Sequence, residues 1–540
     1  MAEEIKPQEA SPSPTMSYLS CKSLREDTGS DVADNSRREN NEVMNQQLSL
    51  LRQRTPTDKL NEINTAPLFT YPILEHARSL ATPTSASPFS QYGLLAGDIQ
   101  NLQTSSEDPR VFYNVATPSS VFICGSQGSG KSHSLSCILE NCLIQSETLG
   151  RLPRPLTGIV FHYDDYASDS HVAPCEAAYL GSDPAVSVRV LCSPTNIRAI
   201  EKSYGKLGDV MVEALRLDQA DLNTKRMLEL MAFDRAQPLY AQIIQRILRD
   251  MRLNQQDKPG KFKYREFRDK LDMENLNPEQ KRGLHQRLDT LESFMVPKQV
   301  KTNMWEKRDV RMGTNWAPKA GELLIVDLSC PCVTTSMACA LFNICLSIFL
   351  AQDSSLGRII ALDEAHRYMG ETSDSEVLTN SLLAAIRFQR HLGARIVIST
   401  QEPTISPKLL DLCSITIVHR FSSPDWLSVL TKHLAGISKV ARVISRMDNT
   451  DTNEEDVNSY GLRGTSVSAD DPIFDLFSQI VELRTGEALV FAPSAIVSLE
   501  KQSSLGHGVK VTPRKLAHHV LRVVMRSRIT ADGGRSIMAS

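Results

Sequence analysis

Short apolar runs alternate with stretches of helical period along most of the chain. Runs of four to eight apolar residues that alternate with helices are typical of parallel strands buried on both faces. The pattern therefore predicts an α/β fold with a mainly parallel sheet. The runs are VFIC from Val121, GIVFHY from Gly158, SVRVLC from Ser187, ELLIVDL from Glu322, RIIALD from Arg358, ARIVIST from Ala394, SITIVHR from Ser414 and EALVFA from Glu487.

The region 196–315 breaks this alternation. Its apolar residues recur every three or four positions with charged residues between them, which predicts a helical insertion within the sheet. A basic segment in it, DKPGKFKYREFRDK from Asp257, contains Phe262 and Tyr264. A solvated helix connection and a nucleic-acid or partner contact are both open for this segment. The periodic positions are Tyr240, Ile243, Ile244, Ile247, Leu248 and Met251, then Leu284, Leu288, Leu291 and Met295.

The ends of the chain differ from its middle. Residues 1–60 are polar and charged with few aromatics, which predicts a disordered tail. Residues 61–110 carry apolar clusters among Ser, Thr and Pro, and we expect an adaptor segment that drapes over the folded part. The last 40 residues hold eight Lys or Arg against one Asp, and KLAHHVLRVVMRSRI from Lys515 resembles a basic amphipathic helix. The expected organisation is a tail (1–60), an adaptor (61–110), the first part of the core (111–195), the insertion (196–315), the second part of the core (316–500) and a basic tail or helix (501–540).

Composition limits the partners. The chain has 540 residues and a formal charge of −3, so no global basic field draws it onto nucleic acid or an acidic membrane. No apolar run reaches the roughly 18 residues of a membrane span, and the N-terminus does not resemble a signal peptide. We expect a soluble intracellular protein of the cytoplasm or nucleus.

The eleven cysteines lie mostly in apolar stretches, which predicts buried, reduced thiols. Cys330 and Cys332 are separated by one residue, which is too close for the usual zinc-binding pair, and no matching Cys or His pair follows. The sequence therefore predicts no cysteine-based metal cage.

The strongest chemical signal is the complete G-x-x-x-x-G-K-S order of a P-loop, between a predicted strand and a predicted helix. Glycines let successive N–H groups face phosphate oxygens, and the helix N-terminus adds partial positive charge. Lys131 would reach the β and γ phosphates, and the Ser132 hydroxyl would bind Mg²⁺. The sequence thus predicts ATP and Mg²⁺ as cofactors. The expected nucleotide-binding residues are Gly125, Ser126, Gln127, Gly128, Ser129, Gly130, Lys131, Ser132 and His133.

A second metal ligand is expected at the end of a neighbouring buried strand. Asp327 and Asp363 both end such strands, but only Asp363 is followed by another acid, Glu364. We predict that Asp363 faces the metal while Glu364 orients the attacking water. The letters DEAH at 363–366 mark some helicases, but no second domain with arginine-rich helicase motifs follows. We interpret DEAH as the end of a Walker B strand and give His366 no catalytic role.

The segment GARIVISTQEPTISPKLLDLCSITIVHRFSSPDW, from Gly393, resembles the HerA-FtsK superfamily of P-loop ATPases, as do IVDLS from Ile325 and RTGEALVF from Arg484. The resemblance implies a RecA-like core that hydrolyses ATP, a hexameric ring as homo-oligomer, and DNA as a candidate partner. It also implies that Gln401 is a polar sensor of the γ-phosphate or attacking water. Arg390 lies where the superfamily has an arginine supplied to the neighbouring subunit's ATP, with Arg387, Arg395 and Arg420 as rivals.

The sequence also departs from that superfamily. No run of alternating strands that would form a β-barrel precedes the P-loop, and no membrane spans or winged DNA-reading domain are evident. Two other functions therefore stay open: an ATP-dependent switch or scaffold without translocation, and a non-hydrolysing nucleotide-binding interaction protein.

Overall fold

The computed structural model describes residues 43–51, 56–81, 87–168, 171–230, 238–257, 260–300, 312–353, 355–433, 472–504 and 507–533. These residues fall into two units, divided between Lys59 and Leu60. In the first, residues 43–50 are helical, and the rest of the predicted tail lies mostly outside the described residues, at 1–42 and 52–55.

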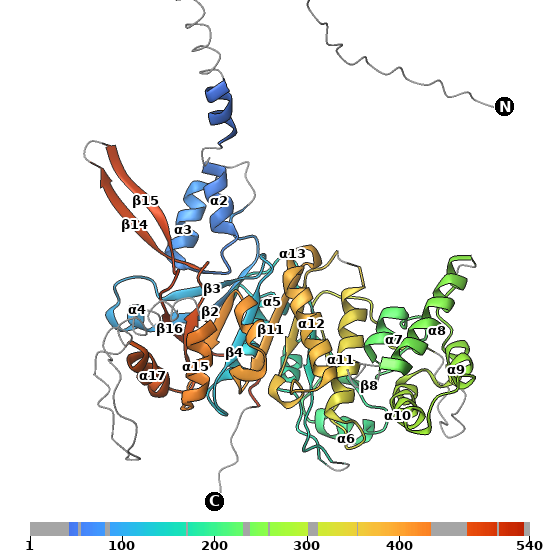
Figure 1. Cartoon of the computed structure of the whole chain (residues 1–540). Coiled ribbons are helices and arrows are strands. Elements are labelled where there is room, and N and C mark those ends of the chain that lie inside the picture. Colours follow the sequence, from blue (N-terminus) through green and yellow to red (C-terminus); the bar gives the residue numbers. More distant parts are fainter. Residues whose placement is uncertain are drawn as a thin grey trace, which may run out of the picture. The chain divides into compact units, whose positions relative to one another are not determined.

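The second unit is built on one large mixed sheet (Figure 1). Its parallel part runs in the order β8-β7-β9-β6-β10-β11-β4-β12, and antiparallel strands continue it beyond β12. The predicted α/β class with a mainly parallel sheet is confirmed, and each of the eight predicted strands forms. They are β4 (Ser120–Cys124), β6 (Thr157–His162), β7 (Ser187–Cys192), β9 (Glu322–Asp327), β10 (Arg358–Leu362), β11 (Ala394–Thr400), β12 (Ile415–Val418) and β13 (Glu487–Phe491).

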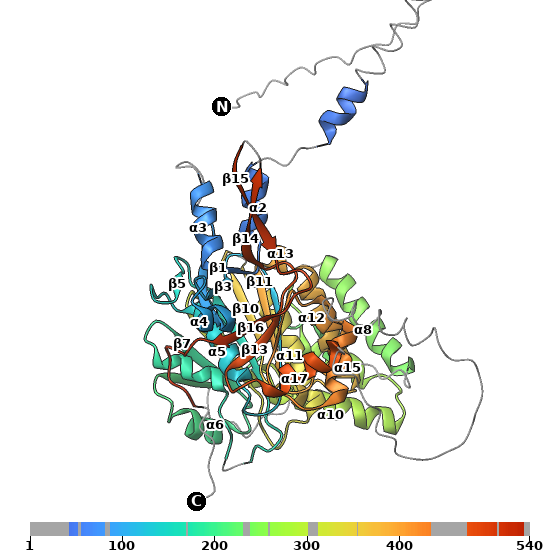
Figure 2. The same cartoon turned by 90° about the vertical axis from the view of Figure 1, so that its left-hand side faces the viewer.

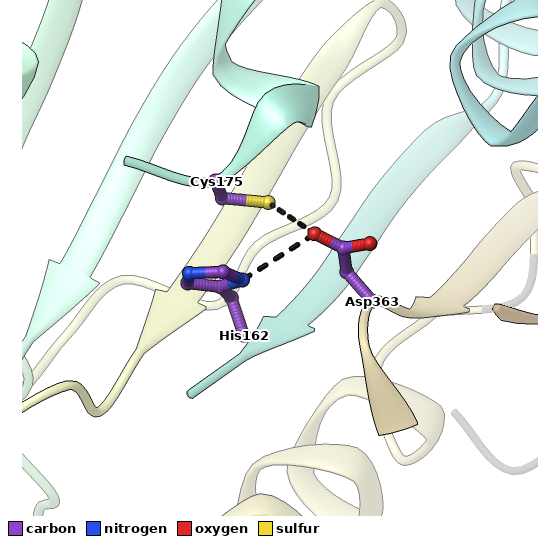
Figure 3. A group of neighbouring side chains, drawn as sticks. All are labelled: His162, Cys175 and Asp363. Atoms are coloured by element: carbon purple, nitrogen blue, oxygen red, sulfur yellow. Dashed lines mark hydrogen bonds and ion pairs between the residues drawn. The ribbon is translucent and has the colours of Figure 1, made fainter. Parts of the chain in front are cut away.

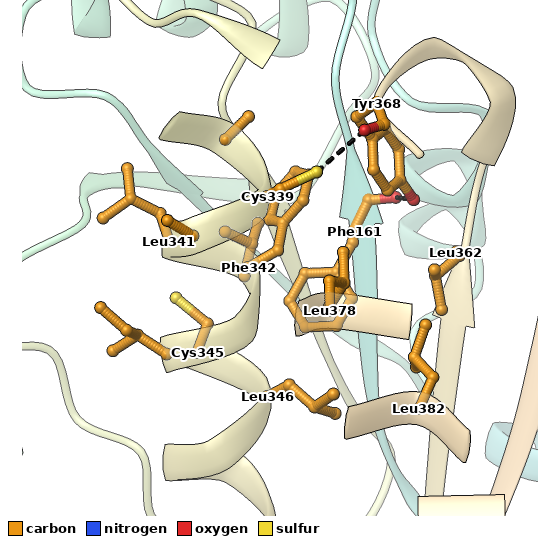
Figure 4. Packing of buried hydrophobic residues seen from close by; sticks show 14 of the residues in the cluster. Phe161, Cys339, Leu341, Phe342, Cys345, Leu346, Leu362, Tyr368, Leu378 and Leu382 are labelled. Atoms are coloured by element: carbon orange, nitrogen blue, oxygen red, sulfur yellow. Dashed lines mark hydrogen bonds between the residues drawn. The ribbon is translucent and has the colours of Figure 1, made fainter. Parts of the chain in front are cut away.

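Alternate residues of the central strands enter two different cores, as the pleat of a strand requires. In β4, Phe122 packs into one core, while Val121 and Ile123 pack into the other. Figure 2 shows α5 and α6 on one side of the sheet and α8, α11 and α12 on the other. Figure 4 shows the first core, where Phe161 of β6 lies 5.0 Å from Phe342 between ring centroids. The helices are α5 (Lys131–Leu143), α6 (Ile197–Tyr204), α8 (Pro238–Asp257), α11 (Thr335–Leu350) and α12 (Ser373–Arg387).

The described residues between 60 and 115 supply three strands of the sheet and do not merely drape over it. Three antiparallel strands from this region join it, and β2 pairs with β16 near the C-terminus. An aromatic core stabilises them, in which Phe69 stacks on Phe89 at 3.7 Å and Phe112 at 5.6 Å between ring centroids. The elements are α2 (Pro56–Asn64), β1 (Leu68–Thr70), α3 (Tyr71–Leu80), β2 (Tyr92–Asp98), α4 (Ile99–Thr104) and β3 (Arg110–Asn114).

The region predicted as a helical insertion is helical but also supplies β8 (Val210–Ala214), an edge strand. The basic segment from Asp257 buries its aromatics: Phe262 is 6% exposed and Tyr264 only 1%. The Tyr264 hydroxyl donates to Glu292 at 2.9 Å. Neither ring is free to stack on a nucleic-acid base. The structure therefore favours the interpretation of this segment as a connection between helices. Besides α6 and α8, the helices are α7 (Thr224–Leu230), α9 (Tyr264–Asp272) and α10 (Pro278–Phe294).

The amphipathic helix predicted from Lys515 is wrong, because this segment forms strand. The residues from Leu521 to Met525 are β16, which fills the space between β13 and β2 and pairs with both. Arg526 then donates to the buried carboxylate of Glu140 at 2.6 Å. Pairing with two open strand edges outweighs the local helical period. The other C-terminal strands are β14 (Ile496–Ser504) and β15 (His507–Lys515).

The thiols behave as the sequence predicted: the cysteines of the described ranges form no disulfide, and most are buried. Among the helices that the structure describes, none is long and apolar enough to cross a membrane.

Candidate functional site

The P-loop joins β4 to α5 in a conformation that depends on glycine. Gly125, Gly128 and Gly130 have φ values of +151°, +71° and +113°, which residues with a Cβ rarely adopt. A Cβ at Gly125 would also lie 2.7 Å from the Cβ of His419 and 2.9 Å from the Ser129 hydroxyl. The loop therefore leads into the N-terminus of a 13-residue helix, whose free N–H groups favour an anion.

Two segments distant in sequence hold this loop. Ser126 donates to the carbonyl of Arg420 from both its backbone N–H and its hydroxyl, each at 2.8 Å. On the other side, the N–H of Gly486 donates to the carbonyl of Ser129 at 3.3 Å. The loop is thus anchored to the residues after β12 and before β13.

His419 lies beneath the loop and is fully buried. Its Nδ1 is 2.9 Å from the carbonyl of Glu487, and its Nε2 is 2.8 Å from the hydroxyl of Ser134. Because a carbonyl only accepts, Nδ1 carries the proton and Nε2 accepts from Ser134. The pKa of His419 is lowered to about 4, chiefly by burial and in smaller part by the charge of Lys131, while the bond to Glu487 acts in the opposite direction. At neutral pH the loop therefore rests on an uncharged imidazole.

Lys131 is 4% exposed, and its ammonium donates to the carbonyl of Ser126 at 3.1 Å. Burial lowers its pKa, while the carboxylates of Glu364 and Asp363 act in the opposite direction. The P-loop lysine therefore lies within electrostatic reach of both acids, although more than two hundred residues separate them.

Asp363 follows β10 and is 2% exposed. One oxygen, Oδ2, lies 3.4 Å from Nδ1 of His162 and 3.5 Å from the thiol of Cys175 (Figure 3). Burial alone would raise the pKa of Asp363, but His162, Cys175 and Lys131 together lower it, so the carboxylate is charged. The other oxygen, Oδ1, has no hydrogen-bond partner among the described residues. A buried charged oxygen without a donor fits a metal ligand. Ser132, the other predicted metal ligand, is the second residue of α5.

Glu364 has a left-handed backbone conformation, with φ +47° and ψ +46°, which is uncommon for a residue with a side chain. Its Oε2 accepts from the side-chain amide of Gln401 at 3.2 Å and lies 3.4 Å from Nδ1 of His366. That Nδ1 also accepts from the backbone N–H of Gln401 at 3.4 Å. Burial lowers the pKa of His366, so the ring is neutral. The turn thus brings together Glu364 and Gln401, two of the predicted catalytic residues.

The strand order explains this convergence. β11 lies between β4 and β10, with Thr400 opposite Cys124 and Leu362 opposite Ile398. The P-loop, Glu364 and Gln401 therefore all follow the carboxyl ends of adjacent parallel strands, where α/β proteins place their ligands. Asp327 ends a strand separated from β10 by β6. It accepts from Tyr204 at 2.6 Å and from the N–H of Ser329 at 2.9 Å, so it has a structural role.

Three of the four candidate arginines do not lie beside the P-loop. Arg390, in α13 (Gln389–Leu392), and Arg387 are exposed and precede β11, at the edge of the sheet opposite the P-loop. Arg395 is 4% exposed and donates to the carbonyls of Gly393 and Ala116, so it cannot reach another subunit. Arg420 is exposed beside the P-loop.

The sequence analysis missed several residues of this site. Gly486 and His419 support the loop, and His162 and Cys175 contact Asp363. His162 and His419 each lie near the end of a predicted strand, at the edge of the sheet that carries the P-loop, and that position could have marked them. No local signal marks Cys175. His133, predicted to bind nucleotide, directs its ring to the carbonyl of Arg526 at 2.8 Å, so only its backbone faces the loop.

A glycine turn between a buried strand and a helix, with two acids after the next strand but one in the sheet, defines a P-loop nucleoside-triphosphate-binding fold. No family model matches the chain, and no curated protein does. Among solved structures it is similar to VirB4 of Thermoanaerobacter pseudethanolicus (10% identity, 83% of this chain and 99% of that one, TM-score 0.44). It is also similar to the plasmid coupling protein TrwB in complex with a non-hydrolysable ATP analogue (13% identity, 84% and 98%, TM-score 0.40). A third is the genome packaging NTPase B204 from Sulfolobus turreted icosahedral virus 2 in complex with ATP-gammaS (8% identity, 73% and 96%, TM-score 0.26).

Proposed function

We propose that this protein binds Mg-ATP and hydrolyses it by an activated water, as a motor ATPase of the HerA-FtsK type. One observation carries the proposal: the P-loop after β4 and the acids Asp363 and Glu364 after β10 lie at the same edge of the sheet, on strands that flank β11. A pocket without catalysis has no physical need for two carboxylates beside a phosphate-binding lysine.

The nucleotide's phosphates would lie in the P-loop, where backbone N–H groups and the ammonium of Lys131 stabilise their charge. Ser132 and the free oxygen of Asp363 would hold Mg²⁺, which supplies charge neutralisation to the phosphates when bound. Lys131 now donates to the carbonyl of Ser126 within its own loop. We expect it to exchange this bond for a phosphate oxygen, because a charged acceptor is the stronger partner.

Glu364 would orient the attacking water and accept its proton. Its strained backbone conformation and its bond to Gln401 hold the carboxylate in one direction. In this role Gln401 both fixes Glu364 and contacts the γ-phosphate or the water. Preorganisation of this kind lowers the barrier because no reorientation is needed at the moment of reaction.

A ring would complete the site. Arg390 is exposed at the opposite edge of the sheet from its own P-loop, so it can serve only a neighbouring copy. Such an arginine would neutralise charge on the transferred phosphoryl group and would couple hydrolysis to assembly. DNA is our candidate for the translocated polymer; a switch without translocation is the second candidate.

The test compares ATP binding and steady-state ATPase rate in matched variants. Lys131→Ala should abolish binding, whereas Lys408→Ala, an exposed lysine of α14 (Pro407–Leu412), should have no effect. Glu364→Gln should retain binding and lower the rate by at least a hundredfold, whereas the exposed Glu371→Gln should not. Full activity in Glu364→Gln would refute the assignment of the general base.

Stimulation by DNA separates the two candidate functions. A translocase should hydrolyse ATP faster when single- or double-stranded DNA is added, and the salt dependence of that effect should reveal phosphate contacts. A rate that DNA leaves unchanged would favour the switch. Mass measurement with and without ATP, on the wild type and on Arg390→Ala, then tests the ring.

A further inference from the structure

Three buried side chains with metal-binding atoms meet beside the P-loop. His162 ends β6, Cys175 precedes the 3₁₀ helix η1 (Glu176–Ser182), and Asp363 follows β10. They are 7%, 0% and 2% exposed, and their ligand atoms all lie within 4.8 Å of one another. Figure 3 shows the sulfur of Cys175 and the ring of His162, which come from separate segments, both directed at one oxygen of Asp363.

The spacing matches a tetrahedral ion. Bonds of about 2.0 Å to nitrogen, 2.1 Å to oxygen and 2.3 Å to sulfur put nitrogen about 3.4 Å and sulfur about 3.6 Å from oxygen at tetrahedral angles. In the structure Nδ1 of His162 is 3.4 Å from Oδ2 of Asp363, and the sulfur of Cys175 is 3.5 Å from the same oxygen. Two of the three separations therefore match those that zinc requires, and the third, between nitrogen and sulfur, is within 4.8 Å.

The imidazole of His162 is a second, independent observation. Neither of its ring nitrogens makes a hydrogen bond of acceptable geometry with any residue that the structure describes. Nδ1 lies 3.4 Å from the charged carboxylate of Asp363, whereas Nε2 has no partner in the described part of the chain, which is costly because it has lost its water. A metal ion bound at Nδ1 would replace this long ion-pair contact with direct bonds to both residues.

A surrounding set of hydrogen bonds holds the ligand-bearing segments. The N–H of Cys175 donates to the hydroxyl of Tyr204 at 2.9 Å, and that hydroxyl donates to Asp327 at 2.6 Å. The N–H of Asp363 donates to the carbonyl of Phe161 at 3.0 Å, one residue before His162. Bonds of this kind around metal ligands fix their directions and strengthen binding.

The mixed donor set selects the kind of ion. Magnesium and calcium take oxygen ligands, whereas sulfur with imidazole nitrogen and a carboxylate suits zinc and related ions. We propose that His162, Cys175 and Asp363 form a mononuclear transition-metal site of the zinc class, with a fourth position open to water. Binding replaces the thiol proton of Cys175, so a thiolate is the ligand and the proton goes to solvent.

The proposed zinc site gives the two carboxylate oxygens of Asp363 different roles. Oδ2 faces His162 and Cys175, and Oδ1 is left for the magnesium ion of the nucleotide. The role of Oδ1 rests on the proposed function, whereas the binding of zinc does not. An ion on Oδ2 would lock the direction of Oδ1 and draw charge from it. Zinc would thus regulate the magnesium site through one shared carboxylate.

The test is direct metal binding to the full chain without nucleotide. After treatment with a chelator and its removal, the protein is titrated with Zn²⁺ in competition with a chromophoric chelator, and separately with Co²⁺. We expect one equivalent of zinc. We also expect a visible Co²⁺ spectrum of tetrahedral intensity with a near-ultraviolet thiolate charge-transfer band. Absence of a stoichiometric zinc site, or a Co²⁺ spectrum without the thiolate band, would overturn the proposal.

Variants locate the site. Cys175→Ser and His162→Gln should each weaken zinc binding at least tenfold and abolish or shift the charge-transfer band. Cys142→Ser, which alters another buried cysteine, should change neither, and unchanged binding in Cys175→Ser refutes the site. Lys131→Ala should keep the zinc while it loses ATP. Failure of the zinc proposal can thereby be distinguished from failure of the ATPase proposal. If a variant does not fold, the Co²⁺ spectrum of the wild type alone decides whether the metal site exists.

Discussion

The uncharged His419 beneath the P-loop makes the stability of the protein depend on pH in a defined window. The pKa of this buried ring is about 4, against 6.5 in the unfolded chain, and burial is the chief cause. Between pH 4 and pH 6.5 the histidine is protonated in the unfolded state but not in the folded state, so the free energy of unfolding rises with pH. The stabilisation that comes from the neutral His419 ring is complete above pH 6.5 and is lost as the pH falls toward 4.

The size of the effect follows from the two pKa values. Each pKa unit corresponds to about 1.4 kcal/mol, so the full loss is about 3 kcal/mol, and the part lost between pH 7 and pH 5 is about 2 kcal/mol. Other groups also titrate in this interval. The informative quantity is therefore the difference between the wild type and a variant without the ring.

His419→Asn is the matched variant, because its amide can still donate toward the carbonyl of Glu487 but does not titrate. Urea unfolding at pH 7 and pH 5 gives the two free-energy changes, and hydrogen exchange of the 120–135 amides reports the P-loop locally. We expect the wild type to lose about 2 kcal/mol more than the variant. Equal losses would refute the reasoning, since they would mean that the ring is not held neutral.

Two further predictions concern the surroundings of the P-loop. Gly125→Ala should weaken nucleotide binding at least tenfold and destabilise the fold by about 1–3 kcal/mol, because its φ is +151° and the new Cβ would lie 2.7 Å from that of His419. Gly128→Ala should lower the free energy of unfolding by only about 1 kcal/mol, because Gly128 has φ +71° but no atom lies within 4 Å of the new Cβ. If isothermal titration and thermal melts show equal effects for the two variants, Gly125 is not the more constrained position. Arg526→Met should lower the free energy of unfolding by about 3–5 kcal/mol, because it leaves the buried carboxylate of Glu140 without its guanidinium. A thermal melt like that of the wild type would show that the C-terminal segment does not stabilise α5.

Features with a local cause were predictable from the sequence. The buried strands are visible because both faces of a parallel sheet need apolar side chains. The P-loop is visible because close approach to phosphate needs glycines at set positions. Asp363 and Glu364 were predictable because they directly follow a buried strand, and the structure places both within electrostatic reach of Lys131.

Features with a non-local cause were not predictable in this way. His419 contacts Ser134 across 285 positions of sequence, and no period or spacing encodes such a pair. His162 meets Asp363 only because β6 pairs with β10, and Cys175 reaches the same carboxylate from the segment before η1. The segment of β16 has apolar residues at helical spacing, yet it forms strand because β13 and β2 leave an opening that a third strand fills.

The sequence by itself determined the α/β class, the central strands and the phosphate-binding loop, since short-range burial patterns and backbone requirements decide them. Only the tertiary structure decided which strands are neighbours. That order brings the imidazole, the thiol and the carboxylate together, and it places a neutral histidine beneath the loop. The physical reason is that a strand's own pattern specifies that it is buried but does not specify its partner.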